Sequence, residues 1–182
     1  MHTDITPSDL VAFWKEAGPS KWFAKDDAFD ARFRERFEAA HFAAARRELD
    51  PWAGTAEGSL ALLILLDQFP RNAFRGTGHA FATDPLARMF AVRAVDGGQD
   101  AAVGNDLRRF FYLPFQHHED RASQERQLAL FQRMERAPGD RWAEHHHDVI
   151  ARFGRFPHRN RVLGRKTTPE EQVFLDADGF RG

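Results

Sequence analysis

Apolar residues recur along most of this chain with the period of an α-helix. The clearest series is spaced by three and four residues and consists of Phe29, Phe33, Phe37, Ala40 and Ala44. Such spacing places the side chains on one face of a helix, and Asp26 or Asp27 can cap its start. Strand formers are few, and no stretch alternates apolar with polar residues for long, so the pattern predicts an all-α fold.

The segment from Ser59 to Phe69 is apolar on every face. It contains six leucine or isoleucine residues between positions 60 and 66. A helix without a polar face is buried, so this segment is predicted to be the central helix. We expect Pro70 to end it, because the residue before a proline is disfavoured in the helical region. Asp67 and Gln68 then lie in a buried last turn, where polar groups need partners.

Local start and stop signals place the remaining elements. One predicted helix begins at Thr6-Pro7-Ser8 and ends at Gly18-Pro19, and another begins at Asp84-Pro85 and ends at Gly97-Gly98. A shorter one runs from Asn105 to Tyr112 before Leu113-Pro114. Three more are expected: one after Asp120 to about Arg136, one from Arg141 to Phe153, and a short one that begins at Thr168-Pro169. The predicted breaks are Pro51 to Gly58, Gly76 to Thr83 and the tight turn Pro138-Gly139-Asp140.

Three of the predicted helix ends carry a proline and are evenly spaced. Pro70, Pro114 and Pro157 lie 44 and 43 residues apart, and each interval holds two predicted helices and a turn. This spacing predicts a tetratricopeptide-like (TPR-like) stack of helical hairpins with about eight helices. The alternative is a helical bundle in which the three helix ends are unrelated.

Composition limits the classes of function. A chain of 182 residues can bury one proper core, so we expect a single all-helical domain over residues 1–182. With 26 basic and 27 acidic residues the net charge is -1, which gives no overall attraction to nucleic acid or to an acidic membrane. The absence of cysteine excludes disulfides and thiol chemistry. No signal-peptide pattern or membrane-length apolar run is present, so the predicted location is cytoplasmic.

Four segments resemble one known family, the DUF924 proteins. They are WFAKDDAFDARFRERF (22–37), LALLILLDQFPRNAFRGTGHAFATD (60–84), FYLPFQHHED (111–120) and RFGRFPHRNRVLGRKTTPEEQVFL (152–175). The resemblance covers nearly the whole chain and implies an all-helical, TPR-like fold. It implies no activity, because none is established for the family. One departure is His118, where the family pattern has a serine.

Two proline-containing corners share one chemistry. Residues 65–76 read LLDQFPRNAFRG, and residues 150–165 read IARFGRFPHRNRVLGR. Guanidinium groups bind carboxylates or phosphates through paired hydrogen bonds, so several around one cleft predict an anion site. The alternative is a buried ion-pair network with Asp67, Glu119 and Asp120 as internal partners.

We hypothesise that the two corners and the turn His117-His118-Glu119-Asp120 line one groove. The predicted ligand-binding residues are Asp67, Arg71, Asn72, Arg75, His117, Glu119, Asp120, Arg152, Arg155, His158, Arg159, Asn160 and Arg165.

Histidines add acid–base and metal chemistry. His117 or His158 is a candidate general base, oriented by Glu119 or Asp120. The pairs with metal-ligand spacing are Glu38/His41, Glu144/His147 and His145/Asp148. A ferritin-like metal centre also needs carboxylates from other helices that point inward, and the central helix offers only Asp67. We therefore predict no metal or other cofactor.

Three functions stay open at this point. The first is a binding module for a small anion or the acidic end of a peptide. The second is a hydrolase or lyase that acts on an anionic substrate with a histidine base. The third is a structural scaffold in which the polar cluster only holds helices together. No nucleic-acid or membrane partner is predicted, because the rings near basic residues lie at core spacing. The oligomeric state stays open.

Overall fold

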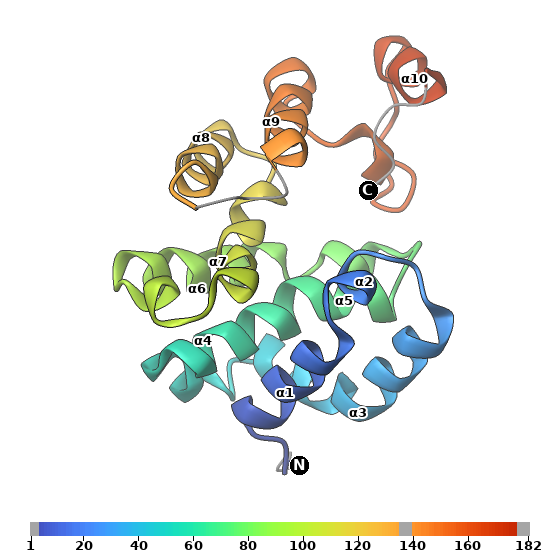
Figure 1. Cartoon of the computed structure of the whole chain (residues 1–182). Helices are drawn as coiled ribbons and strands as arrows, with labels where there is room; N and C mark the ends of the chain where they lie inside the picture. Colours follow the sequence, from blue (N-terminus) through green and yellow to red (C-terminus); the bar gives the residue numbers. More distant parts are fainter. Residues whose placement is uncertain (1–3, 135–139, 178–182) are drawn as a thin grey trace. The chain divides into compact units, whose positions relative to one another are not determined.

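The computed structural model describes residues 4–134 and 140–177, and within them it is helical with no strand (Figure 1). Contacts divide the chain into two compact units. Unit 1 comprises Met1–Arg75 with His79–Pro114, and unit 2 comprises Gly76–Gly78 with Phe115–Gly182. The prediction of a single domain over residues 1–182 stays a prediction.

The helices of unit 1 are α1 (Pro7–Ala17), α2 (Pro19–Trp22), α3 (Asp27–Ala45), α4 (Ala56–Leu63), α5 (Phe69–Ala73), α6 (Asp84–Asp96) and α7 (Asn105–Gln116), whose last two residues belong to unit 2. Those of unit 2 are α8 (Arg121–Phe131), α9 (Asp140–Phe153) and α10 (Pro169–Asp176). Among the described residues, eight helices are seven or more residues long. The all-α fold and the expected number of helices are confirmed.

The helix starts follow the capping signals in the sequence. Thr6 closes a capping box with Asp9 at the start of α1, and Thr168 closes one with Glu171 at the start of α10. The Asp26 carboxylate accepts a hydrogen bond from the Phe29 N–H at 2.9 Å and caps α3. Each of these bonds joins residues three apart, so the local sequence is enough to specify them.

Unit 1 is built around α4, which packs against both α1 and α6. All residues from Gly58 to Pro70 are buried, as the absence of a polar face predicts. Rings from α3 and α1 complete this core. Phe33 meets Phe69 edge to face with ring centroids 5.0 Å apart, and Trp14 meets Phe110 in the same way at 5.4 Å. The predicted face of α3 is confirmed, since the five apolar residues that define it are all buried.

The prediction that Pro70 ends the central helix is wrong. After α4 the chain continues through one wide π-helical turn, Ile64–Gln68, directly into α5. In this turn the Phe69 N–H bonds to the Ile64 carbonyl, five residues back. The widened turn accommodates the proline because the carbonyls that it releases find other donors, which are described below.

The prediction that α7 ends at Tyr112 is also wrong. The helix includes Pro114 and reaches Gln116. A proline inside a helix costs roughly 3 kcal/mol, whereas full burial of one large apolar side chain contributes about 1.5–3 kcal/mol. Phe110, Phe111 and Phe115 are all buried, so packing outweighs the proline.

Of the three evenly spaced prolines, only Pro157 follows a completed helix, so the premise for the repeating hairpins does not hold. The TPR-like arrangement stays a prediction.

Three boundaries differ from expectation. The break at Pro51–Gly58 contains a short 3-10 segment, Asp50–Gly54, and α4 already starts at Ala56. The loop after Gly76 likewise contains a 3-10 segment, Gly78–Phe81. Helix α8 ends at Phe131, short of Arg136. Arg136 and most of the expected turn Pro138-Gly139-Asp140 lie outside the described residues.

Unit 2 is built on α8 and α9, which pack along each other (Figure 1). The Gln127 side chain ties them, because its Nε2 donates to the Ala143 carbonyl at 2.7 Å. Val149, Ile150 and Phe156 form a small core, against which Phe153 and Phe174 pack. This core joins α9 to the segment after it and to α10.

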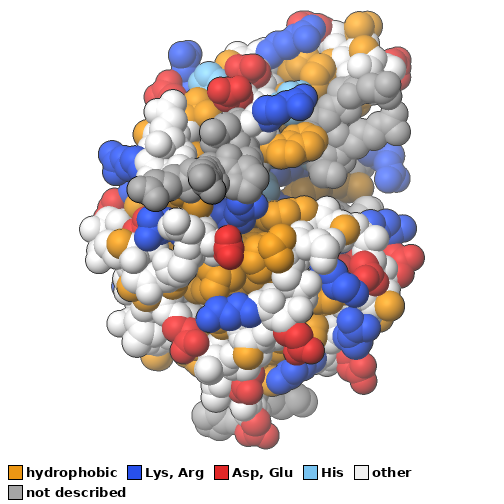
Figure 2. Space-filling model, in the orientation of Figure 1, with side chains coloured by type: hydrophobic (Ala, Val, Ile, Leu, Met, Phe, Trp, Pro, Cys, Tyr) orange, Lys and Arg blue, Asp and Glu red, His pale blue; other side chains and the backbone are white. Residues whose placement is uncertain are grey.

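Charged side chains of both signs are interspersed over the visible face of unit 1, and neither sign gathers into one large patch (Figure 2). No helix in the described part of the chain has the length and apolar character needed to cross a membrane.

Candidate functional site

The first proline corner, in unit 1, is a cluster of side chains bonded to carbonyls of the π turn. His41 Nδ1 donates to the Leu65 carbonyl at 2.8 Å. Thr83 Oγ1 donates to the Leu66 carbonyl at 2.5 Å, and Arg71 donates to the Asp67 carbonyl at 2.7 Å. The Leu66 carbonyl is the one that Pro70, four residues later and without an N–H, leaves open. The π turn is thus stabilised by side chains from α3, α5 and the start of α6.

The arginines of this corner bind carboxylates of the same unit. Arg71 forms a fork on Asp84, with distances of 2.8 and 2.9 Å, and also lies 3.3 Å from the buried Asp67 carboxylate. Arg75 Nε donates to Asp30 at 2.8 Å. Asp67 is one of the internal partners that the ion-pair alternative names for the arginines. The partners Asp84 and Asp30 were not among the predicted site residues.

Asn72 belongs to the same network as Arg75. Its side-chain amide donates to Asp30 at 2.7 Å, and both side chains are buried. The amide therefore orients an internal carboxylate.

A histidine pair adjoins the π turn. His41 Nε2 and His79 Nε2 are 2.9 Å apart, and His41 is fully buried. Burial, together with the nearby His79, lowers the pKa of His41 to about 4, against the opposing effects of the Leu65 carbonyl and Glu38. His79 was not predicted as a site residue. The available signal was that His41 lies on the apolar face of α3, four residues after Phe37.

The second proline corner, in unit 2, is clamped by Glu119. Its carboxylate accepts the Phe156 N–H at 2.8 Å and two hydrogen bonds from Arg165, at 2.6 and 3.0 Å. Burial alone raises the pKa of Glu119, but the bonds from Arg165 and Phe156 and the charge of Arg159 lower it below its ordinary value. Glu119 therefore stays ionised and holds the corner in place.

Glu171 makes a second clamp, from α10. It is buried and accepts two bonds from Arg155, at 2.6 and 2.9 Å, and one from the Asn160 amide at 3.1 Å. The Thr168 N–H also donates to it, at 2.7 Å. The Arg155 hydrogen bonds are the main reason that the pKa of Glu171 falls to about 2. Asn160 and Arg155 were predicted to meet a ligand, and the structure has them binding Glu171.

Two further predicted residues have local roles. Arg152 forms an exposed ion pair with Glu170 at 3.1 Å. Asp120 caps α8 by accepting the Ser123 N–H at 2.9 Å, and its carboxylate also contacts His118. The capping role explains why an acidic residue stands directly before α8.

Two histidines and one arginine lie against the Phe156 ring, and a third histidine lies near one of them. The Arg159 guanidinium carbon lies 4.5 Å from the centre of the Phe156 ring, and the rings of His146 and His158 lie 5.4 and 5.7 Å from it. His117 lies 6.1 Å from His146. Burial, together with the charge of His117, lowers the pKa of His146 to about 3. His146 was not among the predicted site residues, although its position on the buried face of α9 follows from the helical period.

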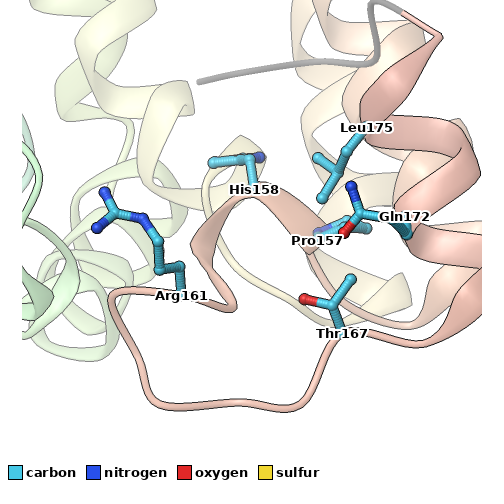
Figure 3. Close-up of a pocket in the computed structure, with 6 residues that line it drawn as sticks. All are labelled: Pro157, His158, Arg161, Thr167, Gln172 and Leu175. Carbon is cyan, nitrogen blue, oxygen red and sulfur yellow. The ribbon is translucent and has the colours of Figure 1, made fainter.

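An open pocket of about 520 Å³ lies beside this group in unit 2. Its lining residues are Pro157, His158, Arg161, Thr167, Gln172 and Leu175. Figure 3 shows Arg161 on the side away from Gln172 and Leu175, with His158 between them. Arg161 is exposed, and it makes no ion pair with any residue that the structure describes. Of the predicted residues only His158 lines this pocket.

The thirteen predicted residues thus fall into two sets. Asp67, Arg71, Asn72 and Arg75 belong to unit 1, and the other nine belong to unit 2. Within each set the arginines with described ion pairs are held by carboxylates of the same unit. The hypothesis that both sets line one groove stays a prediction.

Residues of the pairs with metal-ligand spacing make other contacts. Glu38 binds Arg34 at 3.0 Å, and His147 Nδ1 lies 3.3 Å from Asp148. Within residues 4–134 and 140–177, no three His, Asp or Glu side chains are placed to hold a metal ion.

Comparison with known proteins gives a family and one close structural neighbour. Residues 10–179 match the model of a family described as bacterial protein of unknown function, DUF924. The structure of a protein of unknown function from Agrobacterium tumefaciens is similar, with a TM-score of 0.91 and 60% sequence identity over 94% of this chain and 97% of that one. No curated protein matches the chain.

Proposed function

We propose that this chain, which belongs to the DUF924 family of bacterial proteins of unknown function, binds a small anionic ligand in the unit 2 pocket. The observation that carries the proposal is the contrast between Arg161 and its neighbours. Arg152, Arg155 and Arg165 are held by Glu170, Glu171 and Glu119. Arg161 lines a pocket and has no ion pair among the described residues. Its guanidinium is therefore available to a ligand.

The rest of the pocket suits a small anion with an apolar part. Thr167 offers a hydroxyl that can donate a hydrogen bond. Gln172 donates one amide N–H to Asp176 at 2.8 Å and has a second N–H to offer. Pro157 and Leu175 supply apolar surface. Ligand sites commonly combine an apolar lining with a few polar groups that fix orientation.

The neighbouring arginines support the pocket and do not line it. Arg155 and Asn160 hold Glu171, and Glu171 caps the helix that carries Gln172 and Leu175. The Arg155 guanidinium also donates to the Lys166 carbonyl at 2.9 Å, next to Thr167. These residues, first predicted as ligand donors, are proposed to position the donors.

A thermal-shift screen against small carboxylates and inorganic phosphate tests the proposal, followed by calorimetric titration of each hit. A ligand present at 100 times its Kd stabilises the folded protein by about 2.7 kcal/mol. We expect Arg161→Gln to weaken binding at least tenfold without lowering Tm, because the side chain is exposed and has no internal ion pair.

The matched control is Arg152→Gln, another exposed arginine of unit 2 that does not line the pocket. It should bind the ligand as the wild type does. Equal affinity of the wild type and Arg161→Gln, or the absence of any anion that stabilises the protein, would rule out this site.

A second candidate is catalysis on an anionic substrate, and it is favoured by the presence of His158 in the pocket lining. A histidine base predicts a rate that falls as pH drops through the histidine pKa. The test is a panel of ester, phosphoester and lyase substrates assayed between pH 5 and 9, with His158→Asn as the variant. A rate that is independent of His158 excludes this role.

A further inference from the structure

A second feature, in unit 1, is independent of the pocket: the hydrogen bond between His41 and His79. His41 lies on α3, and His79 lies in the 3-10 segment Gly78–Phe81. Their Nε2 atoms are 2.9 Å apart. The His79 ring packs on Phe74 with centroids 4.1 Å apart, and the His41 ring stacks on Phe69 at 5.0 Å. The pair thus links the 3-10 segment to α3, and aromatic rings pack on both histidines.

The hydrogen bonds of the pair determine which ring nitrogens carry a hydrogen. The Leu65 carbonyl can only accept, so His41 Nδ1 carries a hydrogen and donates to it. His41 Nε2 in the neutral ring is then an acceptor, and His79 Nε2 must be the donor. A proton can be added to His79 Nδ1 without breaking this bond. A proton added to His41 Nε2 while His79 Nε2 keeps its hydrogen removes the acceptor and sets two N–H groups against each other.

The charged groups around the pair do not keep His41 protonated. On α3, Glu38 favours a proton on His41, but it is bonded to Arg34 at 3.0 Å. The Arg34 guanidinium lies over Phe74. On the π turn and α5, Asp67 is paired with Arg71. On the 3-10 segment, the group that acts on His41 is His79 itself. Burial dominates, and the pKa of His41 falls to about 4.

The fastened turn lies where the chain re-enters unit 1. Residues Gly76–Gly78 belong to unit 2, and His79 is the first residue after them. Gly78 is packed closely within unit 2, because a Cβ at this position would lie 3.1 Å from the Val162 carbonyl. Within unit 1 the returning segment is held by His79 and by the Thr83 bond to the Leu66 carbonyl.

We propose that the His41–His79 pair is a proton-sensitive latch, which holds residues 79–81 on α3 while His41 Nε2 is unprotonated and releases them when that nitrogen takes up a proton while His79 Nε2 keeps its own. The released state takes up one proton more than the closed state, so acid favours release. With an ordinary histidine pKa of about 6.5 in the released state, lowering the pH from 7.5 to 5.0 raises the released population by about 30-fold.

Amide hydrogen exchange of the full chain, followed by mass spectrometry at pH 7.5 and pH 5.0 and corrected for intrinsic rates, tests the latch. Protection of residues 79–82 should fall by about 30-fold at the lower pH. The terminal turns of α1 and α10 serve as the internal reference, because their amides exchange by local fraying that leaves His41 and His146 buried, and their protection should change much less. A glutamine amide can donate to neutral His41 Nε2 through its nitrogen and accept from protonated His41 Nε2 through its oxygen, so His79→Gln should keep the segment protected at pH 5.0. His79→Ala removes the donor and should leave it unprotected at both values.

The control variant is His147→Gln, which changes a histidine of unit 2 and should show the wild-type response. Equal protection of the wild-type segment at both pH values would overturn the proposal. So would a loss in His79→Gln as large as in the wild type, or an equal loss in every helix, which would indicate general acid unfolding.

Discussion

At the scale of single residues, the arginines of the two corners are mostly satisfied within their own units. Arg71 meets Asp84 across 13 residues, Arg75 meets Asp30 across 45, and Arg165 meets Glu119 across 46. A forked, charge-assisted hydrogen bond to a partly buried carboxylate fixes the geometry of two segments. For these arginines the described contacts favour the ion-pair network over direct ligand binding.

Glu119 gives a direct test of that view. Glu119→Gln should lower the free energy of unfolding by about 2 kcal/mol, because it weakens two hydrogen bonds from Arg165 and one from Phe156. Glu170→Gln is the matched control, since its pair with Arg152 is exposed, and it should change stability by less than about 0.5 kcal/mol. Urea unfolding measures both. Equal effects would mean that the clamp contributes no more than a surface pair.

The same carboxylate predicts a pH effect. The folded-state pKa of Glu119 is lowered, so its contribution is fully present above its ordinary value near 4.5 and is lost as the pH falls below it. The difference in stability between the wild type and Glu119→Gln should therefore shrink between pH 5 and pH 3. A difference that stays constant over this range would show that the carboxylate charge is not the source of the stabilisation.

At the scale of elements, the turn between α4 and α5 depends on side chains from elsewhere. A π turn followed by a proline leaves buried carbonyls without helical partners, and each unpaired one costs about 1–3 kcal/mol. His41, Thr83 and Arg71 supply the missing donors. The helix continues through Pro70 because these donors are present.

A substitution at Thr83 tests one of those hydrogen bonds by itself. Thr83→Val keeps the shape of the side chain but removes the donor to the buried Leu66 carbonyl. The expected loss of unfolding free energy is about 1–3 kcal/mol, whereas Thr83→Ser should retain most of the stability. Chemical denaturation of the two variants side by side measures the difference. If valine and serine are equivalent, another donor satisfies the carbonyl.

Helix α10 is held in a comparable way by Glu171. Arg155→Ala leaves this buried carboxylate without its guanidinium partner and removes the two hydrogen bonds that the guanidinium donates to it. We expect faster amide exchange in residues 169–176 and a lower Tm. A variant with wild-type stability and no anion binding would instead return Arg155 to the list of ligand donors.

At the scale of the whole molecule, a buried neutral histidine in each unit makes stability depend on pH. Burial lowers the pKa of His41 to about 4 and that of His146 to about 3. Both histidines protonate in the unfolded chain near pH 6.5, so their stabilisation is fully present above that value. It is lost progressively as the pH falls toward the folded-state pKa.

Between pH 7.5 and 5.0 each histidine should account for about 2 kcal/mol of lost stability. Urea unfolding at the two pH values measures this loss. His146→Leu keeps the site apolar and removes the titrating group. Between the two pH values this variant should therefore lose about 2 kcal/mol less stability than the wild type. An identical pH dependence in this variant would show that His146 is protonated in the folded protein.

Local patterns account for most of the fold that the sequence predicts. The all-α class, the buried run from Leu60 to Leu66, the apolar face of α3 and the caps at Thr6, Asp26 and Thr168 were all correct. Each rests on contacts between residues at most four apart or on the period of a helix. These are properties that the order of residues determines without reference to the rest of the chain.

Tertiary contacts decided what lies farther apart. A proline's local preference did not reveal that Thr83 would satisfy the Leu66 carbonyl, nor that the burial of phenylalanines around Pro114 would outweigh that proline, so two predicted helix ends were wrong. The arginine clusters were visible in the sequence, but their partners Asp30, Asp84 and Glu171 were not, and neither were the His41–His79 pair and the position of Arg161 in a pocket. The sequence determined which groups carry charge and which helices they stand on. The folded structure decided which charges neutralise one another and which stay open to a ligand, because that choice requires distant segments to be brought within the 3 Å of a hydrogen bond.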